Sequence, residues 1–145
     1  MPNVLYTAEA HVTGGRGQGH GRTSDGQLDV QLRLPKEMGG AGDGTNPEQL
    51  FAVGYAACFE GALGAVSRRE KLELGAVAID SSVSLVTTED RGYTVAVKLD
   101  VTLPDISDGD QAKQIVAAAH KVCPYSNATR GNIDVELVAN GQPVG

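Results

Sequence analysis

The stretch from Leu50 to Val66 limits the possible folds more than any other part of the sequence. Glu60 is its only charged residue, and the others are apolar or small. Such a pattern is typical of a helix that is buried on every side, because an amphipathic helix would carry a polar face. Asn46 before the run can cap a helix, Pro47 suits its first turn, and Gln49 can complete a capping box.

Three glycines interrupt this predicted helix, at positions 54, 61 and 64. Each costs about 1 kcal/mol of helix propensity relative to alanine, which indicates that another backbone passes close by. A chain of 145 residues is expected to form one domain, 1–145, with few elements to surround such a helix. We therefore expect a homodimer in which a second copy covers it. A membrane span is the competing interpretation, but the short length of the run and its central Glu60 argue against one.

The rest of the chain alternates between strand and turn signals. Residues 5–13 and 28–34 predict two strands, with a glycine-rich loop at 14–21 between them. Residues 77–87 and 93–103 predict a hairpin, and the apolar residues of its second strand alternate regularly.

The C-terminal third predicts a second helix and a last strand. The helix is expected from Gly109 to Lys121, with Ser107 or Asp108 as its cap and Pro124 ending it. Ile133, Val135 and Leu137 alternate with acidic residues as a strand. The predicted fold class is α+β, with antiparallel strands and two main helices.

Charge and composition exclude several functions. The formal net charge of −6 argues against a nucleic-acid partner, which would require a basic surface. The N-terminal residues lack the pattern of a secretory signal, so we expect a cytoplasmic protein whose thiols are normally reduced. The segment GGRGQGHGR lacks the nucleotide-binding fingerprints, and the histidines and cysteines lack the paired spacing of strong zinc sites. We expect no cofactor and no metal.

Cys58 lies inside the apolar run, where burial would raise the pKa of its thiol. It follows Asn46 by twelve residues, or about 18 Å of helix, so the helix dipole cannot acidify it. A reactive Cys58 therefore needs a cation from elsewhere, and Arg16 and Arg22 in the glycine-rich segment are candidates. Without one, a buried cysteine is usually a small hydrophobic residue.

A guanidinium beside a thiolate must itself be held, and a carboxylate does this well. Glu48 and Glu60 are candidates. Glu60 is two residues from Cys58 and points to another face of the helix. Glu48 lies ten residues away, a rise of about 15 Å, so it most simply serves the Cys58 of a partner subunit.

Four segments resemble a known family. They are GGR at 14–16, SDGQLDVQL at 24–32, GTNPEQLFAVGYAACFEGAL at 44–63 and VCPYSNATRGNIDV at 122–135. Together they are similar to the organic hydroperoxide resistance proteins (Ohr) of the OsmC superfamily, over nearly the whole chain.

The resemblance implies an OsmC-like fold, an intertwined homodimer with central buried helices, and a thiol peroxidase. It implies that Cys58 is the peroxidatic cysteine, Cys123 the resolving cysteine, Arg16 the activating cation and Glu48 the residue that positions it. The glycine-rich segment is one residue longer than usual in the family, which leaves Arg22 as an alternative, but Arg16 matches the GGR position. The implied substrates are organic and fatty-acid hydroperoxides, and the implied reductant is a lipoylated protein or dihydrolipoamide.

Four apolar residues of the long helix can line a pocket for an alkyl chain, although core packing explains each of them equally well: Leu50, Phe51, Phe59 and Leu63. Three other functions compete with an Ohr-type peroxidase. These are a peroxide-sensing dithiol switch, an OsmC-type peroxidase, and a lipid-binding module with two inert thiols.

Overall fold

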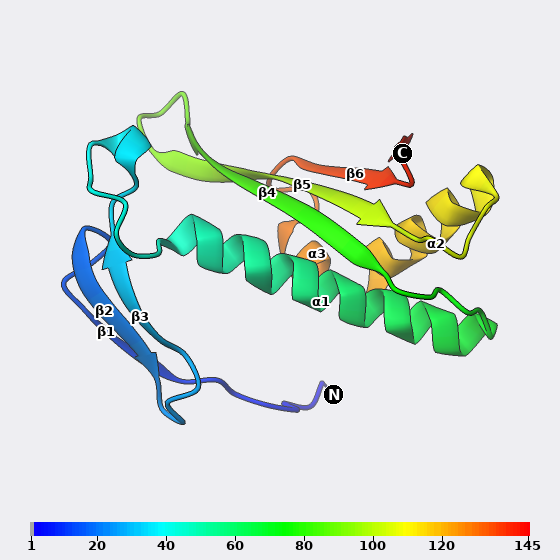
Figure 1. Ribbon diagram of the computed structural model, residues 1–145, viewed down its shortest axis with the longest axis horizontal. Helices are drawn as coiled ribbons and strands as arrows, with labels where there is room; N and C mark the ends of the chain where they lie inside the picture. The colour runs from blue at the N-terminus through cyan, green and yellow to red at the C-terminus, as the bar shows by residue number, and fades with distance from the viewer. Residues whose placement is uncertain (1) are drawn as a thin grey trace. The chain divides into compact units, whose positions relative to one another are not determined.

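The computed structural model describes residues 2–145. Two compact units divide between Leu50 and Phe51. Helix α1 (Pro47–Glu70) begins in the first unit and continues through the second (Figure 1).

The first unit holds a three-stranded antiparallel sheet in the order β1-β2-β3. Its strands are β1 (Ala10–Thr13), β2 (Gln18–Thr23) and β3 (Asp29–Arg33). A 3₁₀ turn, Lys36–Met38, follows β3. The sheet therefore brings together residues on both sides of the glycine-rich segment.

Two expectations for this unit were wrong. The first strand begins at Ala10 and not at Leu5, and half of the expected loop at 14–21 is strand β2. Strand propensity misled here because glycine is a poor strand former. The tight β1–β2 turn requires glycine nonetheless: a Cβ at Gly19 would lie 1.9 Å from the carbonyl oxygen of Gly15.

Helix α1 begins where the sequence predicts. Asn46 Oδ1 accepts a hydrogen bond of 2.9 Å from the Gln49 backbone amide, which satisfies one of the free donors at the helix start. The Gln49 side chain reaches back past Asn46 without bonding its backbone amide, so the capping box is not formed. It accepts a hydrogen bond from the Thr45 hydroxyl at 2.6 Å.

The second unit contains a four-stranded sheet in the order β4-β5-β6-β7. The strands are β4 (Ala78–Thr87), β5 (Tyr93–Thr102), β6 (Val135–Ala139) and β7 (Gln142–Val144). β4 and β5 form the predicted hairpin, with Ala78 opposite Thr102 and Thr87 opposite Tyr93.

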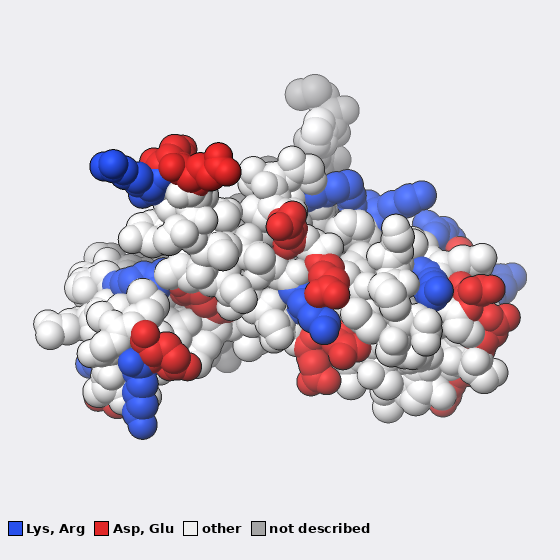
Figure 2. All heavy atoms as spheres, turned by 90° about the horizontal axis from the view of Figure 1, so that it is seen from above, with Lys and Arg blue, Asp and Glu red and all other residues white. Residues whose placement is uncertain are grey.

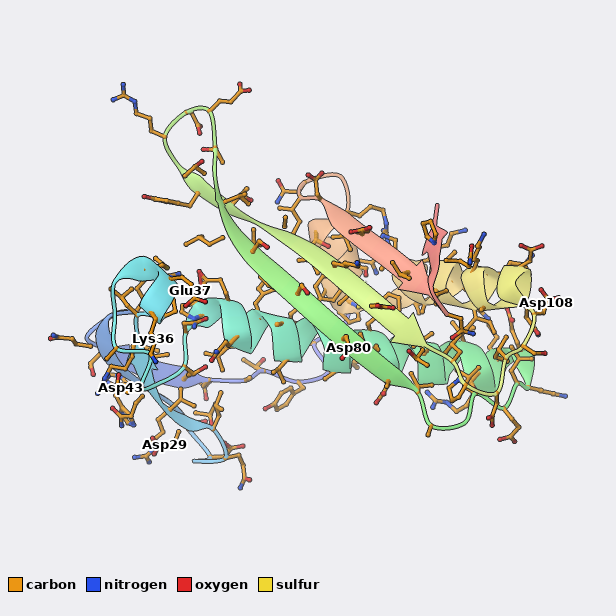
Figure 3. The ribbon with its side chains drawn as sticks, turned by 45° about the horizontal axis from the view of Figure 1, so that its top comes forward. Asp29, Lys36, Glu37, Asp43, Asp80 and Asp108 are labelled. Atoms are coloured by element: carbon orange, nitrogen blue, oxygen red, sulfur yellow. The ribbon has the colours of Figure 1, made fainter. Side chains whose placement is uncertain are left out.

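The β5–β6 pair is parallel, unlike the antiparallel strands expected throughout. A parallel pair needs a long crossover. Two helices supply it, α2 (Gly109–Val122) and α3 (Pro124–Thr129). Asp108, labelled in Figure 3, caps α2 by accepting hydrogen bonds from the amides of Asp110 and Gln111. The predicted second helix is thus confirmed, while α3 and β7 were not predicted. The α+β fold class is confirmed.

One face of the second sheet forms the core with the helices. On β5, Val97, Leu99 and Val101 are buried. Lys98, which lies between the first two, and Thr102, which follows Val101, are exposed. The helices add a cluster of fully enclosed side chains to this face: Tyr55, Phe59, Leu63, Val66, Ile115, Val116 and Ala119.

A single chain buries only one side of α1. Val53 is 71% exposed, and Ala57, Gly61 and Ala65 lie on the same open side. A Cβ at Gly61 would meet nothing within 4 Å, so among residues 2–145 no other backbone segment approaches Gly61 closely. The all-round burial expected for this helix is therefore not reached within one chain.

α1 is also the one helix of residues 2–145 that is long and apolar enough to cross a membrane, by length and composition alone. Core helices of soluble proteins have the same property, so this is weak evidence. Acidic and basic side chains are interspersed on the face that Figure 2 shows.

Candidate functional site

The two cysteines lie together although 65 positions separate them. The Sγ atom of Cys123 lies 3.7 Å from the Sγ atom of Cys58, and both thiols are free. Cys58 is half-buried on α1, and Cys123 is completely buried where α2 meets α3. The two sulfurs are therefore close enough for a short movement to join them, since a disulfide bond is about 2.05 Å long.

The position of Cys123 follows from the proline after it. Pro124 has no backbone N–H, so α2 cannot continue through it, and Cys123 adopts an extended conformation with φ −65° and ψ 124°. Proline also suits the first turn of a new helix, which is α3. The Cys123 amide donates to Ala119 O and its carbonyl accepts from the Asn127 amide, each at 2.9 Å. Both helix ends thus hold this residue.

The surroundings of Cys58 disfavour its thiolate. Burial raises the pKa of the Cys58 thiol above its ordinary value, and the neighbouring Cys123 adds to the rise. The backbone amide of Tyr125 opposes it by hydrogen bonding. No cation of residues 2–145 is among the groups that shift this pKa. Within one chain, Cys58 is therefore a weakly ionised thiol at neutral pH.

Arg16 and Glu48 form an ion pair in the first unit. Arg16 Nη2 lies 3.0 Å from Glu48 Oε1 and 3.3 Å from Oε2. Arg16 Nη1 is buried and has no hydrogen-bond partner among residues 2–145. The guanidinium is therefore held by a carboxylate of its own chain and keeps a donor that is not used.

The alternative residues, Arg22 and Glu60, are both exposed. Arg22 lies exposed on β2, opposite Asp29 of β3. Glu60 is exposed on α1, two positions beyond Cys58. Neither takes part in an ion pair within residues 2–145. Of the two candidate arginines, Arg16 is the one that a carboxylate holds.

The four residues expected to line a pocket differ in burial. Phe59 and Leu63 are completely buried in the core, which is what packing alone requires. Leu50 and Phe51 are half-buried. Phe51 contacts Tyr125 edge to face, with ring centroids 5.8 Å apart.

Sequence reasoning missed a hydroxyl network beside the cysteines. Tyr55 Oη lies 2.8 Å from Ser126 Oγ and 3.1 Å from Thr129 Oγ1, and His120 Nδ1 lies 2.8 Å from Ser126 Oγ. A signal was present, since His120, Cys123, Ser126 and Thr129 recur every third residue. The predicted helix stop at Pro124 concealed it. Within residues 2–145, no group of three potential metal ligands is suitably placed.

Comparison with known proteins agrees with this fold. A family model described as OsmC-like protein matches residues 40–138. The organic hydroperoxide resistance protein of Xanthomonas axonopodis pv. citri is 55% identical over 136 residues, which cover 92% of this chain and 94% of that protein. The chain belongs to the Ohr proteins of the OsmC-like family.

Solved structures of similar proteins cover almost the whole chain. A Vibrio cholerae protein with captopril bound in one of its active sites has a TM-score of 0.92 and 43% identity, covering 98% of this chain and 96% of that one. The organic hydroperoxide resistance protein OhrB of Bacillus subtilis has a TM-score of 0.83 and 46% identity, covering 93% and 98%. The resemblance of the four sequence segments to Ohr proteins is thereby confirmed.

Proposed function

We propose that this Ohr-family protein is a thiol peroxidase that reduces organic hydroperoxides to alcohols. The observation that carries the proposal is the pair of free thiols, with 3.7 Å between the sulfurs of Cys58 and Cys123. The names of its relatives, organic hydroperoxide resistance proteins, supply the substrate class.

Cys58 is the peroxidatic residue because it is the more accessible of the two thiols. Its thiolate attacks one oxygen of the hydroperoxide, the O–O bond breaks, and the other oxygen leaves as an alcohol after taking a proton. The sulfur is oxidised to a sulfenic acid while the peroxide is reduced.

Cys123 then resolves the sulfenic acid. Its sulfur attacks that of Cys58, an S–S bond forms, the S–O bond breaks, and the hydroxyl group leaves as water with the Cys123 proton. A dithiol returns the enzyme to its starting state by exchange, and becomes a disulfide itself. We propose dihydrolipoamide or a lipoylated protein as this dithiol.

The first step needs a cation, because burial in its own chain raises the pKa of Cys58. We propose Arg16 for this role, with Glu48 positioning it. The ion pair between them and the unused Nη1 donor of Arg16 support the assignment. That donor is free to bond an anion such as a thiolate.

A homodimer would bring the Arg16–Glu48 ion pair of one subunit to the Cys58 sulfur of the other. Glu48 and Cys58 are ten residues apart on one continuous helix, a separation of about 15 Å along its axis. A second α1 running antiparallel to the first would place its Glu48 near this Cys58. The open side of α1 supports such a contact, since Ala57 and Gly61 let another helix approach closely. We propose that the dimer acts in the cytoplasm.

The substrate's alkyl chain needs an apolar surface beside Cys58. Phe51 and Leu50 are the proposed contacts, because both keep part of their apolar surface exposed. Phe59 and Leu63 would support them from within the core.

Steady-state turnover tests the proposal. Catalytic amounts of the protein are mixed with cumene hydroperoxide and dihydrolipoamide, and peroxide consumption is followed. We expect many turnovers per protein molecule, and none from Cys58→Ser. A single oxidation without turnover would indicate a sensor, and full activity in Cys58→Ser would refute the assignment.

A further inference from the structure

A chain of hydroxyl groups lies inside the otherwise apolar core next to the two thiols. Tyr55 and Ser126 are completely buried, and Thr129 is 8% exposed. A buried hydroxyl without a partner destabilises a fold, so buried polar groups are normally paired. These satisfy one another through the contacts of 2.8 Å and 3.1 Å made by the Tyr55 hydroxyl.

His120 extends the network to a third helix. Its Nδ1 lies 2.8 Å from Ser126 Oγ, so α1, α2 and α3 are joined through one serine hydroxyl. Burial lowers the pKa of His120, and the neighbouring Arg130 lowers it further. The ring is therefore neutral near pH 7, and its Nδ1 can donate to Ser126 or accept from it.

Each thiol has a member of this network one helical turn away. Tyr55 precedes Cys58 by three residues on α1. His120 precedes Cys123 by three residues, and Ser126 follows Cys123 by three. α3 has only six residues, so it is too short to be stable by its own hydrogen bonds. Its attachment to α1 fixes the segment that carries the Cys123 sulfur.

Hydrogen bonds suit this task because they depend on direction as well as distance. Cys123 makes no hydrogen bond to the four network residues within residues 2–145: its sulfur lies 3.7 Å from that of Cys58, and its backbone is bonded to Ala119 and Asn127 at the adjoining helix ends. Loss of the Tyr55–Ser126 bond would allow α3 to shift while the apolar core stays packed. The Sγ–Sγ distance of 3.7 Å would then fluctuate.

We propose that Tyr55, Ser126, Thr129 and His120 are positioning residues that hold Cys123 in reach of Cys58 for disulfide formation. The inference rests on the proposed thiol peroxidase function and assigns these residues to its resolving step. A Cys58 sulfenic acid either condenses with Cys123, releasing water, or reacts with a second hydroperoxide to give a sulfinic acid and an alcohol. The network favours condensation by keeping the Cys123 sulfur close to the Cys58 sulfur. It does not act on the first attack of Cys58 on the peroxide.

The test compares Ser126→Ala and Tyr55→Phe with the wild-type protein. Each variant removes only oxygen atoms from the network. Reduced protein is treated with increasing amounts of cumene hydroperoxide, and mass spectrometry measures the disulfide and sulfinic forms. We expect the sulfinic fraction at a fixed peroxide excess to rise about fivefold, the effect of losing one typical hydrogen bond. The rate at which the Cys58 thiol is first consumed should stay within about twofold of wild type.

Two controls separate positioning from general destabilisation. Tyr93→Phe removes a hydroxyl from a tyrosine that is 72% exposed, and it should behave as wild type. Asn140→Ala removes a side chain that bonds Leu103 and Ile106, so it should lower stability without changing the sulfinic fraction. Thr129→Ser keeps the hydroxyl and should match wild type, whereas Thr129→Val should raise the sulfinic fraction.

The outcomes are distinct. Wild-type partitioning in Ser126→Ala, Tyr55→Phe and Thr129→Val would overturn the inference and leave the peroxidase proposal intact. A sulfinic fraction that rises equally in Asn140→Ala would also overturn it, because instability alone would explain the effect. If wild-type protein forms no disulfide at all, the proposed function and this inference both fail.

Discussion

Asn140 is expected to contribute strongly to stability, because its side chain makes three hydrogen bonds to the backbone. Its Oδ1 accepts from the Leu103 amide at 2.7 Å, and its Nδ2 donates to the carbonyls of Leu103 and Ile106 at 3.1 Å and 3.0 Å. These bonds tie the turn between β6 and β7 to the segment that leads from β5 into α2. Asn140 also has a φ of 48°, a conformation that asparagine adopts more readily than most residues.

The substitution Asn140→Ala should destabilise the fold by about 3 kcal/mol. Three hydrogen bonds at about 1 kcal/mol each give about 3 kcal/mol. Alanine at positive φ adds about 1 kcal/mol, and water reaching the freed groups returns a similar amount. At roughly 3 °C per kcal/mol for a chain of this size, the melting temperature should fall by about 10 °C.

Urea denaturation monitored by circular dichroism measures this change at one fixed protein concentration, because the stability of the proposed dimer would depend on concentration. Asn140→Gly provides a matched variant, since it loses the same bonds without the strain at positive φ. It should be about 1 kcal/mol more stable than Asn140→Ala. A change below about 0.5 kcal/mol in Asn140→Ala would refute the reasoning, because that is the range of surface substitutions.

Three further predictions concern the thiols and the proposed dimer. Replacing Arg16 with alanine should slow the reaction of Cys58 with hydroperoxide and move its iodoacetamide alkylation to higher pH, because no cation then counters the rise in the thiol pKa that burial causes; an unchanged pH profile would rule out Arg16 as the activating cation. Glu48→Gln should give a smaller shift in the same direction, measured the same way, since the ion pair is lost but the guanidinium remains. Val53→Lys, on the open side of α1, should give a monomer by size-exclusion chromatography with light scattering, while Val53→Ala stays dimeric; a dimer in both would place the interface elsewhere.

Local signals made α1 and the β4–β5 hairpin predictable. Asn46 and Pro47 mark the start of α1, and its apolar run has no competing pattern. In β5, apolar residues recur at every second position from Val95 to Val101, and three of them, Val97, Leu99 and Val101, are buried. In these elements the local preference and the tertiary environment agree.

The missed elements depend on backbone approach and strand pairing, which the pattern of residues along one segment does not show. Strand β2 contains Gly19, where a Cβ would lie 1.9 Å from the carbonyl oxygen of Gly15 and 2.7 Å from that of Thr13, and the sequence pattern does not show this close approach. β6 pairs in parallel with β5. The alternation of apolar and polar residues within β6 predicts a strand but does not specify which strand it pairs with, or in which direction.

The candidate site was predictable from the sequence only in part. The Arg16 and Cys123 assignments came from a resemblance to the Ohr family, because the spacing of single residues does not reveal which ones meet. The hydroxyl network was missed because Ser126 and Thr129 look like ordinary polar helix residues until the fold buries them against Tyr55.

The central claim is that Cys58 and Cys123 act as one dithiol. Mass spectrometry of the reduced protein after one equivalent of organic hydroperoxide tests it most directly. The sulfurs, 3.7 Å apart, should be joined in a disulfide within one chain, with peptides containing Cys58 and Cys123 linked after digestion. Recovery of Cys123 as a free thiol beside an oxidised Cys58, or of both as free thiols, would contradict the account.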